Sequence, residues 1–392
     1  MNERNIFGEF RTISLATFEQ GAFALSNMAL ALGISRKSGL AGVGEFGVAI
    51  ALSIIAANLF RAIVTEPALL SGSSRHWVNA IRSLLAAESL ILLALTAHTL
   101  LRGAEGVVFF GLALFGAQIA FEVCRLWGIG ASRYRLIVGL DLIWLVFVAA
   151  PAVFGSSAQQ VVAGWCLGAV VGGLVGLFSM AKELSGSVSE PPAFEVRRDL
   201  VVIFLSTGFV IQLAAAVIAA LDVTVGGAFR IAQTLLGPSR LVIQGLRMGF
   251  VSRCRTSKSG AVPMASSLSL VAFASVGVGV VAVLVGLESN VFAVFGITRT
   301  SVLVEAILFL GIDRAMVALG IGPAVVLRSR GQTNVLRDAS IFAGVIAIAY
   351  IALASALAAT SWLQGGPLIA SGVLAATSWF GIATKKELMS HV

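Results

Sequence analysis

The sequence predicts an all-α integral membrane protein with about 12 transmembrane helices in two six-helix bundles. Its 392 residues are 58% hydrophobic and only 12% charged, whereas soluble domains have about 25% charged residues. Apolar runs close to the roughly 20 residues that cross a bilayer recur from end to end. A long hydrophilic linker divides these runs evenly. These observations favour a polytopic membrane protein over a soluble domain.

The individual spans follow from the hydropathy, with ends defined to within a few residues. The first run lacks a small-residue cleavage site, so we expect a retained helix and not a signal peptide. The twelve predicted spans cover residues 10–33, 42–65, 77–101, 105–124, 135–154, 158–181, 199–221, 225–252, 263–287, 302–327, 338–360 and 365–384.

The longest hydrophilic stretch is KELSGSVSEPPAFEVRR, residues 182–198, which contains two prolines and charges of both signs. It predicts an N-terminal six-helix bundle over residues 1–183 and a cytoplasmic linker over 184–198. A C-terminal six-helix bundle is then predicted over residues 199–392.

Lysine and arginine are distributed unevenly between the two sides of the predicted spans. With the N-terminus inside, the cytoplasmic segments hold 18 of them, and the outer loops hold 4. Since cytoplasmic loops are rich in Lys and Arg, both termini are predicted to be cytoplasmic. The same distribution accounts for a sequence pI of about 10.1 without a nucleic-acid partner.

The two halves contain a weak repeat. Residues 43–49, VGEFGVA, and residues 226–232, GGAFRIA, stand at equivalent places at the start of the second and the eighth span. Six helices per half in one orientation imply parallel repeats, related by a pseudo-twofold axis along the membrane normal. The substrate site is then expected between the halves.

A polar stripe runs along the predicted span 225–252. Its members are spaced alternately by three and four residues, which places them on one helix face. Gly237-Pro238 lies at the middle, where a kink is expected because proline lacks a backbone donor. An arginine at mid-bilayer costs at least roughly 2.5–3.5 kcal/mol, so these side chains should face a wet cavity or carboxylates. The stripe comprises Arg230, Gln233, Gly237, Arg240, Gln244 and Arg247.

Acidic residues also lie within predicted spans, where ionisable groups are functional candidates by default. Glu19, Glu88 and Asp141 fall in the first, third and fifth spans, and Asp313 precedes Arg314 in the tenth. Glu19 or Asp313 could simply neutralise an arginine of the stripe. The two roles are compatible, because a cation held by a carboxylate can exchange that partner for a ligand.

Several other motifs predict local structure. Gly164, Gly168, Gly172 and Gly176 form a small-residue ridge that lets another helix approach closely. Pro67 is expected to end the second helix, where Glu66 and Arg82 could pair near the headgroups. The aromatic residues at span ends are expected to be interface anchors; these are Trp77, Trp127, Tyr134 and Trp362.

Enzymatic motifs do not stand in a suitable context. GVGEFG, residues 42–47, matches a dinucleotide fingerprint by letter, but no strand precedes it. The sequence contains no G-x-x-x-x-G-K-[ST] and no H-E-x-x-H, and its three cysteines have no metal or redox spacing. We therefore expect a non-enzyme without a cofactor or metal.

Four segments carry a resemblance to a known family: FEQGAFALSN (18–27), GISRKSGLAGVGEFGVAIAL (33–52), RAIVTEP (61–67) and GGAFRIAQTLLGPSRLVIQGLRMG (226–249). They resemble the polysaccharide and oligosaccharide-lipid flippases of the multidrug/oligosaccharidyl-lipid/polysaccharide exporter superfamily. The resemblance implies two bundles in a V around a central, often cationic cavity, working by alternating access. This chain is somewhat short for the family and lacks the two extra helices of lipid II flippases.

The resemblance also implies a substrate, an undecaprenyl-type lipid-linked sugar, and a cavity-lining role for several residues. These are Glu19, Arg61, Arg230, Arg240 and Arg314. Guanidinium groups bind pyrophosphate by charge-assisted bidentate bonds, so Arg230, Arg240 and Arg314 are expected to bind the headgroup beside Gln233 and Gln244. Glu19 and Asp313 would neutralise them in the empty site or carry a coupled proton.

The expected setting is the bacterial plasma membrane, with membrane lipids and glycosyltransferases of the same pathway as partners. Whether an H+ or Na+ gradient drives transport stays open. Two alternatives stay open as well. One is a cation-coupled multidrug exporter of the same superfamily, and the other is a non-transporting membrane scaffold subunit.

The charge distribution gives a topology that can be measured. A fluorescent protein fused to either end of the chain should fluoresce, because it folds only in the cytoplasm. Alkaline phosphatase fused to the same ends should be inactive, and it should be active when inserted beside Arg299 in a predicted outer loop. Phosphatase activity at the chain ends would contradict the predicted orientation.

Overall fold

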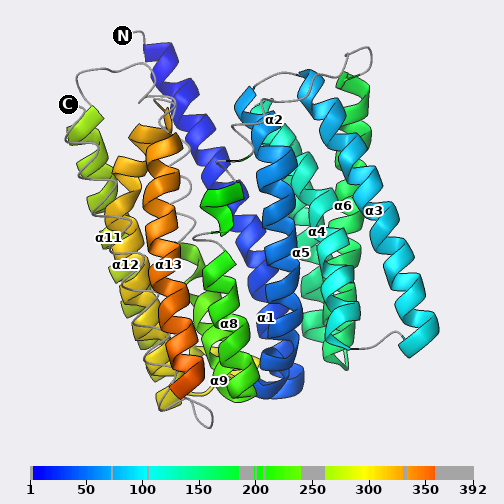
Figure 1. The fold of residues 1–392 in the computed structure, drawn as a ribbon, viewed down its shortest axis with the longest axis vertical. Coiled ribbons are helices and arrows are strands. Elements are labelled where there is room, and N and C mark those ends of the chain that lie inside the picture. The colour runs from blue at the N-terminus through cyan, green and yellow to red at the C-terminus, as the bar shows by residue number, and fades with distance from the viewer. Residues whose placement is uncertain are drawn as a thin grey trace. The chain divides into compact units, whose positions relative to one another are not determined.

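The computed structural model describes residues 3–71, 74–103, 106–131, 133–184, 198, 201–205, 209–239, 261–329 and 333–357. All regular structure in these residues is helical (Figure 1). The chain divides into two compact units, Met1–Phe204 and Leu205–Val392, and each is described by itself. The predicted twelfth span, 365–384, lies outside the described residues, as does most of the predicted linker.

The first helix of unit 1, α1 (Glu3–Phe60), is a pair of helices joined at Gly39. A helix of 58 residues would be roughly 87 Å long at 1.5 Å per residue, far more than a bilayer spans. Gly39 has φ 66° and ψ −170°, a conformation that glycine adopts without a Cβ clash. The second segment runs back toward the end of the unit where the chain begins (Figure 1), so α1 provides the first two predicted spans.

The chain does not end its helix at Pro67, contrary to the sequence prediction. α1 continues into a π-helix, η1 (Arg61–Thr65), and then into α2 (Glu66–Ser71). The reason is geometric. The wider π-turn ends where Glu66 N–H donates to Arg61 O, and Pro67, which has no N–H to donate, follows as the second residue of α2.

Four further helices complete the described part of unit 1. They are α3 (Ser74–Arg102), α4 (Val107–Gly130), α5 (Tyr134–Phe154) and α6 (Ala158–Leu184). Short turns join them, and Gly103 and Gly106, between α3 and α4, both have positive φ. α1 packs against α4, α5 and α6, whereas α3 packs mainly against α4.

The glycine ridge of α6 is the surface on which α4 and α5 approach, as predicted. A Cβ at Gly168 would lie 2.7 Å from Phe147 Cβ and 2.9 Å from Trp144 Cδ1. A Cβ at Gly172 would lie 2.8 Å from Phe121, and one at Gly176 would lie 2.6 Å from Cys124 Cβ. No real Cβ fits such spaces, so the ridge sets the helix spacing.

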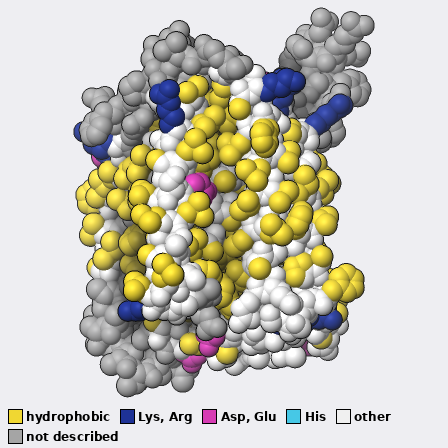
Figure 2. Space-filling view, turned by 90° about the vertical axis from the view of Figure 1, so that its right-hand side faces the viewer, with side chains coloured by type: hydrophobic (Ala, Val, Ile, Leu, Met, Phe, Trp, Pro, Cys, Tyr) yellow, Lys and Arg dark blue, Asp and Glu magenta, His cyan; other side chains and the backbone are white. Residues whose placement is uncertain are grey.

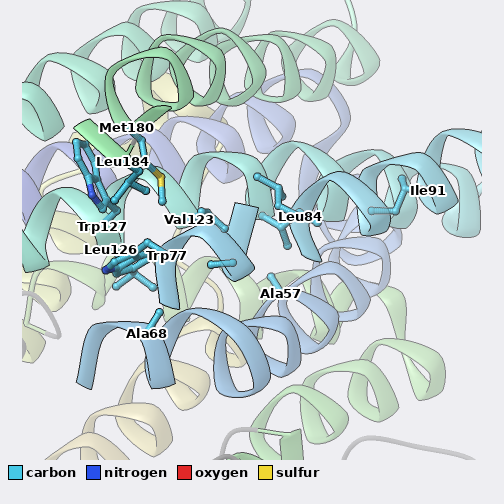
Figure 3. Close-up of a cluster of buried hydrophobic side chains, with 12 residues drawn as sticks. Ala57, Ala68, Trp77, Leu84, Ile91, Val123, Leu126, Trp127, Met180 and Leu184 are labelled. Atoms are coloured by element: carbon cyan, nitrogen blue, oxygen red, sulfur yellow. The ribbon is translucent and has the colours of Figure 1, made fainter. Parts of the chain in front are cut away.

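One end of unit 1 is filled by a hydrophobic cluster from α1, α2, α3, α4 and α6 (Figure 3). Trp77 and Trp127, predicted as interface anchors, are only 5% and 3% exposed and belong to this cluster. That prediction is wrong for both, because the ends of α2 and α6 cover the two indoles with Ala68, Met180 and Leu184.

Unit 2 contains α8 (Phe209–Leu221), α9 (Val223–Leu235), α11 (Ala261–Glu288), the short 3-10 helix η3 (Val291–Phe295), α12 (Ser301–Ser329) and α13 (Thr333–Leu357). α11 and α12 form an antiparallel pair. Ser269 Oγ of α11 donates to Leu319 O of α12 at 2.9 Å. α12 also packs against α9, and α9 packs against α8.

Six described helices are long and apolar enough to cross a membrane, when the continuous stretch Gly21–Leu69 is counted as one. Their outward faces carry many exposed leucines, valines and phenylalanines. Figure 2 shows one such face, where hydrophobic side chains form a broad band and basic side chains lie toward its two ends. The protein is therefore a multi-pass membrane protein. The arrangement of twelve helices as a V around a cavity stays a prediction.

The glycine ridge can be tested with a matched pair of substitutions. Gly168→Ala should destabilise unit 1 by about 1–3 kcal/mol, because overpacking displaces Phe147 and Trp144. Gly139→Ala is the control, since a Cβ there meets nothing within 4 Å; it should be neutral or stabilising by about 0.5–1 kcal/mol. Thermal unfolding in detergent measures both, and equal effects would contradict the ridge.

Candidate functional site

The site in unit 2 begins with the start of α9. Asp222 caps this helix, and its carboxylate accepts hydrogen bonds from the N–H groups of Thr224 at 2.8 Å and Val225 at 3.1 Å. α8 approaches closely because Gly226 has no Cβ, which would lie 2.5 Å from Ala219. α9 is buried from Val225 to Phe229. The helical spacing of three residues places Arg230 and Gln233 on the same face, one turn apart.

Arg230 and Gln233 are joined directly. Arg230 Nη1 donates to Gln233 Oε1 at 3.1 Å, and both side chains are partly buried. Arg230 and Gln233, the described stripe residues with polar side chains, thus form one polar group, as their spacing of three suggested. Arg240 and Gln244, the other two predicted site residues of this stripe, lie outside the described residues.

α9 stops at the place where the sequence predicted a kink. Its last residue is Leu235, Leu236 is the C-cap, and Gly237-Pro238 follows. Proline cannot donate a backbone hydrogen bond to the carbonyl four residues earlier. A helix end also leaves carbonyl groups without intrahelical donors, and in a bilayer water does not replace them. The break therefore needs donors from elsewhere.

Arg314 of α12 supplies two such donors, and Ser239 supplies others. Its Nη2 donates to Gln233 O at 2.9 Å, and its Nη1 donates to Leu236 O. The same Nη1 lies 3.5 Å from Ser239 Oγ, and Ser239 Oγ itself donates to Leu236 O at 2.7 Å. A cation at the C-terminal end of a helix is also favoured by the helix dipole. Arg314 acts here as a cap for α9.

Two guanidinium groups therefore converge on one residue. Gln233 accepts Arg230 with its side-chain oxygen and Arg314 with its backbone oxygen. Asp313, next to Arg314, is buried in the same helix. The three predicted residues Arg230, Gln233 and Arg314 are thus brought together, and Arg314 is bound to backbone oxygens in a way that the sequence did not indicate.

Unit 1 holds a second charged group at η1. Arg61 Nη1 donates to Glu122 Oε1 of α4 at 3.2 Å, and Arg61 Nε lies 4.0 Å from Glu66 Oε2. Arg61 is the predicted cavity residue of this unit, and two carboxylates hold it within the unit. Glu19 lies in α1, but its side chain lies outside the part of the structure that can be described.

A buried arginine and a buried aspartate lie deeper in unit 1. Arg125 is 4% exposed and Asp141 is 0% exposed. The Arg125 guanidinium stacks over the Phe23 ring at 4.0 Å, a cation–π contact. Phe23 in turn packs edge-on against Trp144, one turn from Asp141 on α5. Arg125, which the span limits placed in a cytoplasmic loop, is instead enclosed by the bundle because α4 extends to Gly130.

Sequence reasoning missed Glu122 and Arg125. The signal was present, since the two opposite charges are three residues apart inside the apolar run FGAQIAFEVCRLWG. Such spacing places both on one helix face. Among the residues the structure describes, no group of three or more His, Cys, Asp or Glu side chains could hold a metal ion.

Comparison with solved structures identifies the fold. The chain is similar to a multidrug resistance MATE family transporter of the MOP superfamily in an outward-facing conformation, with TM-score 0.59 and 14% identity over 97% of this chain and 96% of that one. A MATE structure in the bent conformation gives TM-score 0.59 and 15% identity over 97% and 95%. A MOP superfamily transporter from Pyrococcus furiosus gives TM-score 0.50 and 12% identity, also over 97% and 95%.

The fold is therefore that of the MATE transporters of the MOP superfamily, over nearly the whole chain. No family model matches the sequence. No curated protein matches it either. The polysaccharide-flippase family suggested by the sequence stays a prediction.

The Arg314 cap can be tested by removing first the guanidinium group and then Pro238, the residue that interrupts the helix. Arg314→Gln should destabilise unit 2 by about 2 kcal/mol, because it removes two charge-assisted hydrogen bonds to backbone oxygens. Pro238→Ala restores an N–H that lets α9 continue, so the helix's own donors replace the guanidinium. The double variant should then lose less stability than Arg314→Gln alone.

The control for this test is Arg299→Gln, which removes an exposed arginine that pairs with Glu288. Pro238→Ala should not change its effect. Thermal unfolding of the three single variants and of the two double variants that carry Pro238→Ala gives the coupling. Strictly additive effects of Arg314→Gln and Pro238→Ala would contradict the cap.

Proposed function

We propose that this protein is a flippase or exporter that moves a lipid-pyrophosphate-linked oligosaccharide or polysaccharide precursor across the plasma membrane by alternating access. The fold of MATE transporters supports a membrane exporter in general. The observation that carries the substrate class is the convergence of Arg230 and Arg314 on Gln233.

The physical case rests on the charge of the headgroup. A pyrophosphate is a multiply charged anion that must pass a hydrocarbon layer, and guanidinium groups bind it by charge-assisted, bidentate bonds. Placing an arginine within a membrane costs free energy unless it has a partner or faces water, and such arginines commonly mark functional sites. Arg230 donates to the neutral amide oxygen of Gln233, which binds a cation less strongly than a phosphate oxygen does.

This difference gives each residue a role. Arg230 is the exchangeable arginine, because a phosphate oxygen can replace Gln233 Oε1 as its acceptor. Arg314 is the fixed arginine, because its donors are used by the carbonyl oxygens of Gln233 and Leu236, and it contributes charge to the site. Arg240 and Gln244 follow on the same predicted stripe and would bind the headgroup further along the path. Asp313 and Glu19 would neutralise the empty site.

A second candidate is a cation-coupled multidrug exporter. It is favoured by one observation, since one of the similar solved structures is described as a multidrug resistance MATE family transporter. The Pyrococcus furiosus structure is described as having a binding pocket of reverse polarity that suggests a different function. Pocket polarity is therefore the property that separates the candidates, and organic cations prefer acidic and aromatic surroundings.

Transport by proteoliposomes decides between the two candidates. A fluorescent short-chain pyrophosphate-lipid sugar should cross the membrane, and Arg230→Ala and Arg240→Ala should each lower its initial rate at least about tenfold, which corresponds to about 1.4 kcal/mol of lost transition-state binding. Arg299→Ala, in an exposed ion pair, should leave the rate unchanged.

The opposite result is equally clear. If both Arg230→Ala and Arg240→Ala proteins are folded and transport the lipid at the normal rate, the headgroup role is wrong. Transport of an organic cation such as ethidium, with no transport of the pyrophosphate lipid, would establish the multidrug alternative.

A further inference from the structure

A carboxylic acid in unit 1 lies apart from every charged group described so far. Glu88 is at the middle of α3, the helix of unit 1 that is least enclosed by its neighbours. Its Oε1 is buried without a hydrogen-bond partner, and it takes part in no ion pair within the described residues.

The surroundings of Glu88 are apolar. On α4 it faces Gly116, where an added Cβ would lie 3.2 Å from Glu88 Oε2 and 3.2 Å from Ile91 Cγ2. The neighbouring Leu85, Leu90 and Leu92 are exposed on the outer surface of α3. The carboxyl group therefore lies between α3 and α4, beside the hydrocarbon, in the space left by the missing Cβ of Gly116. We call this space the notch.

Charged groups on the packed elements do not reach this notch. α3 packs against α4, α2, η1 and α6, and α4 presents Glu122 six residues beyond Gly116, which is roughly 9 Å along the helix. Arg82 is six residues before Glu88 on α3 itself, at a similar separation. No hydrogen bond or ion pair joins Glu88 to any charged group of the described residues. Those of the packed elements are Arg61, Glu66, His76, Arg82, His98, Arg102, Glu122, Arg125, Lys182 and Glu183.

An ionised carboxylate does not fit this place. Burying a charge without a partner is far more costly than burying a hydrogen-bonded polar group, and charges among hydrocarbon are tolerated only with water or a counter-ion. A metal ion would need several ligands, and among the described residues no group of three or more His, Cys, Asp or Glu side chains could hold one. A proton is the one cation that a single carboxylate binds by itself.

From this geometry we infer that Glu88 is a proton-binding site between α3 and α4, occupied in the arrangement described here. The neutral acid is the form that seats against Gly116, and loss of the proton requires the side chain to reach water or α3 to separate from α4. The site is distinct from the arginines of unit 2. Proton binding at this site is coupled to the packing of α3 against α4.

Carbodiimide labelling of the full-length protein in lipid nanodiscs tests the inference without any transport substrate. Dicyclohexylcarbodiimide partitions into hydrocarbon and adds to protonated carboxyl groups, so at neutral pH Glu88 should gain the mass of one reagent molecule. Glu122, a carboxylate held by Arg61 at 3.2 Å, is the internal control and should stay unlabelled. A water-soluble carbodiimide should not label Glu88.

An infrared measurement gives a second readout. The C=O stretching band of a protonated carboxyl should be present in the wild-type protein and should lose intensity in Glu88→Gln, which keeps the shape of the neutral acid. No adduct on Glu88, equal labelling by both carbodiimides, or an unchanged carboxyl band would each overturn the proton site. Because neither experiment uses a lipid-linked sugar, the result is independent of the proposed function.

Discussion

In unit 2 the guanidinium group of Arg314 binds the backbone oxygens at the end of α9. This interaction determines where Arg230 and Gln233 stand, because it joins α12 to the last turn of the helix that carries them. At the break before Gly237-Pro238 it adds a cationic donor to Gln233 O and Leu236 O, and Leu236 O also accepts from the N–H and the Oγ of Ser239. Unsatisfied backbone groups among apolar helices cost several kcal/mol each.

The same constraint applies to the charged groups within the spans of unit 1, which find different partners in place of water. Arg61 is held by Glu122 and Glu66, and Arg125 lies over the ring of Phe23. Glu88 has neither a cation nor a donor among the described residues, so a proton is its remaining partner. These differences between acceptors are the basis of the proposed function, in which Arg230 exchanges one of its acceptors, the neutral amide oxygen of Gln233, for a phosphate oxygen.

Much of this was predictable from the sequence. Hydropathy gave the helical membrane fold, the four-residue spacing of glycines gave the α6 contact surface, and Gly237-Pro238 gave the position of the break. The partners were not predictable, because the contact of Arg314 with Gln233 joins residues 81 apart in the chain. The prediction that the helix ends at Pro67 was wrong because a π-helical turn, η1, precedes the proline and the helix continues through it. The prediction that Trp77 and Trp127 are interface anchors was wrong because a position at the end of a span does not reveal whether another helix covers the ring.

The account depends on the claim that Arg230 receives an anionic headgroup. The most direct measurement is native mass spectrometry of the protein with a polyprenyl pyrophosphate and with the corresponding neutral polyprenol. The account predicts that the pyrophosphate binds at least about tenfold more tightly than the alcohol, and that Arg230→Gln removes this preference while Arg299→Gln keeps it. Equal binding of the pyrophosphate and the alcohol by the wild-type protein would contradict it.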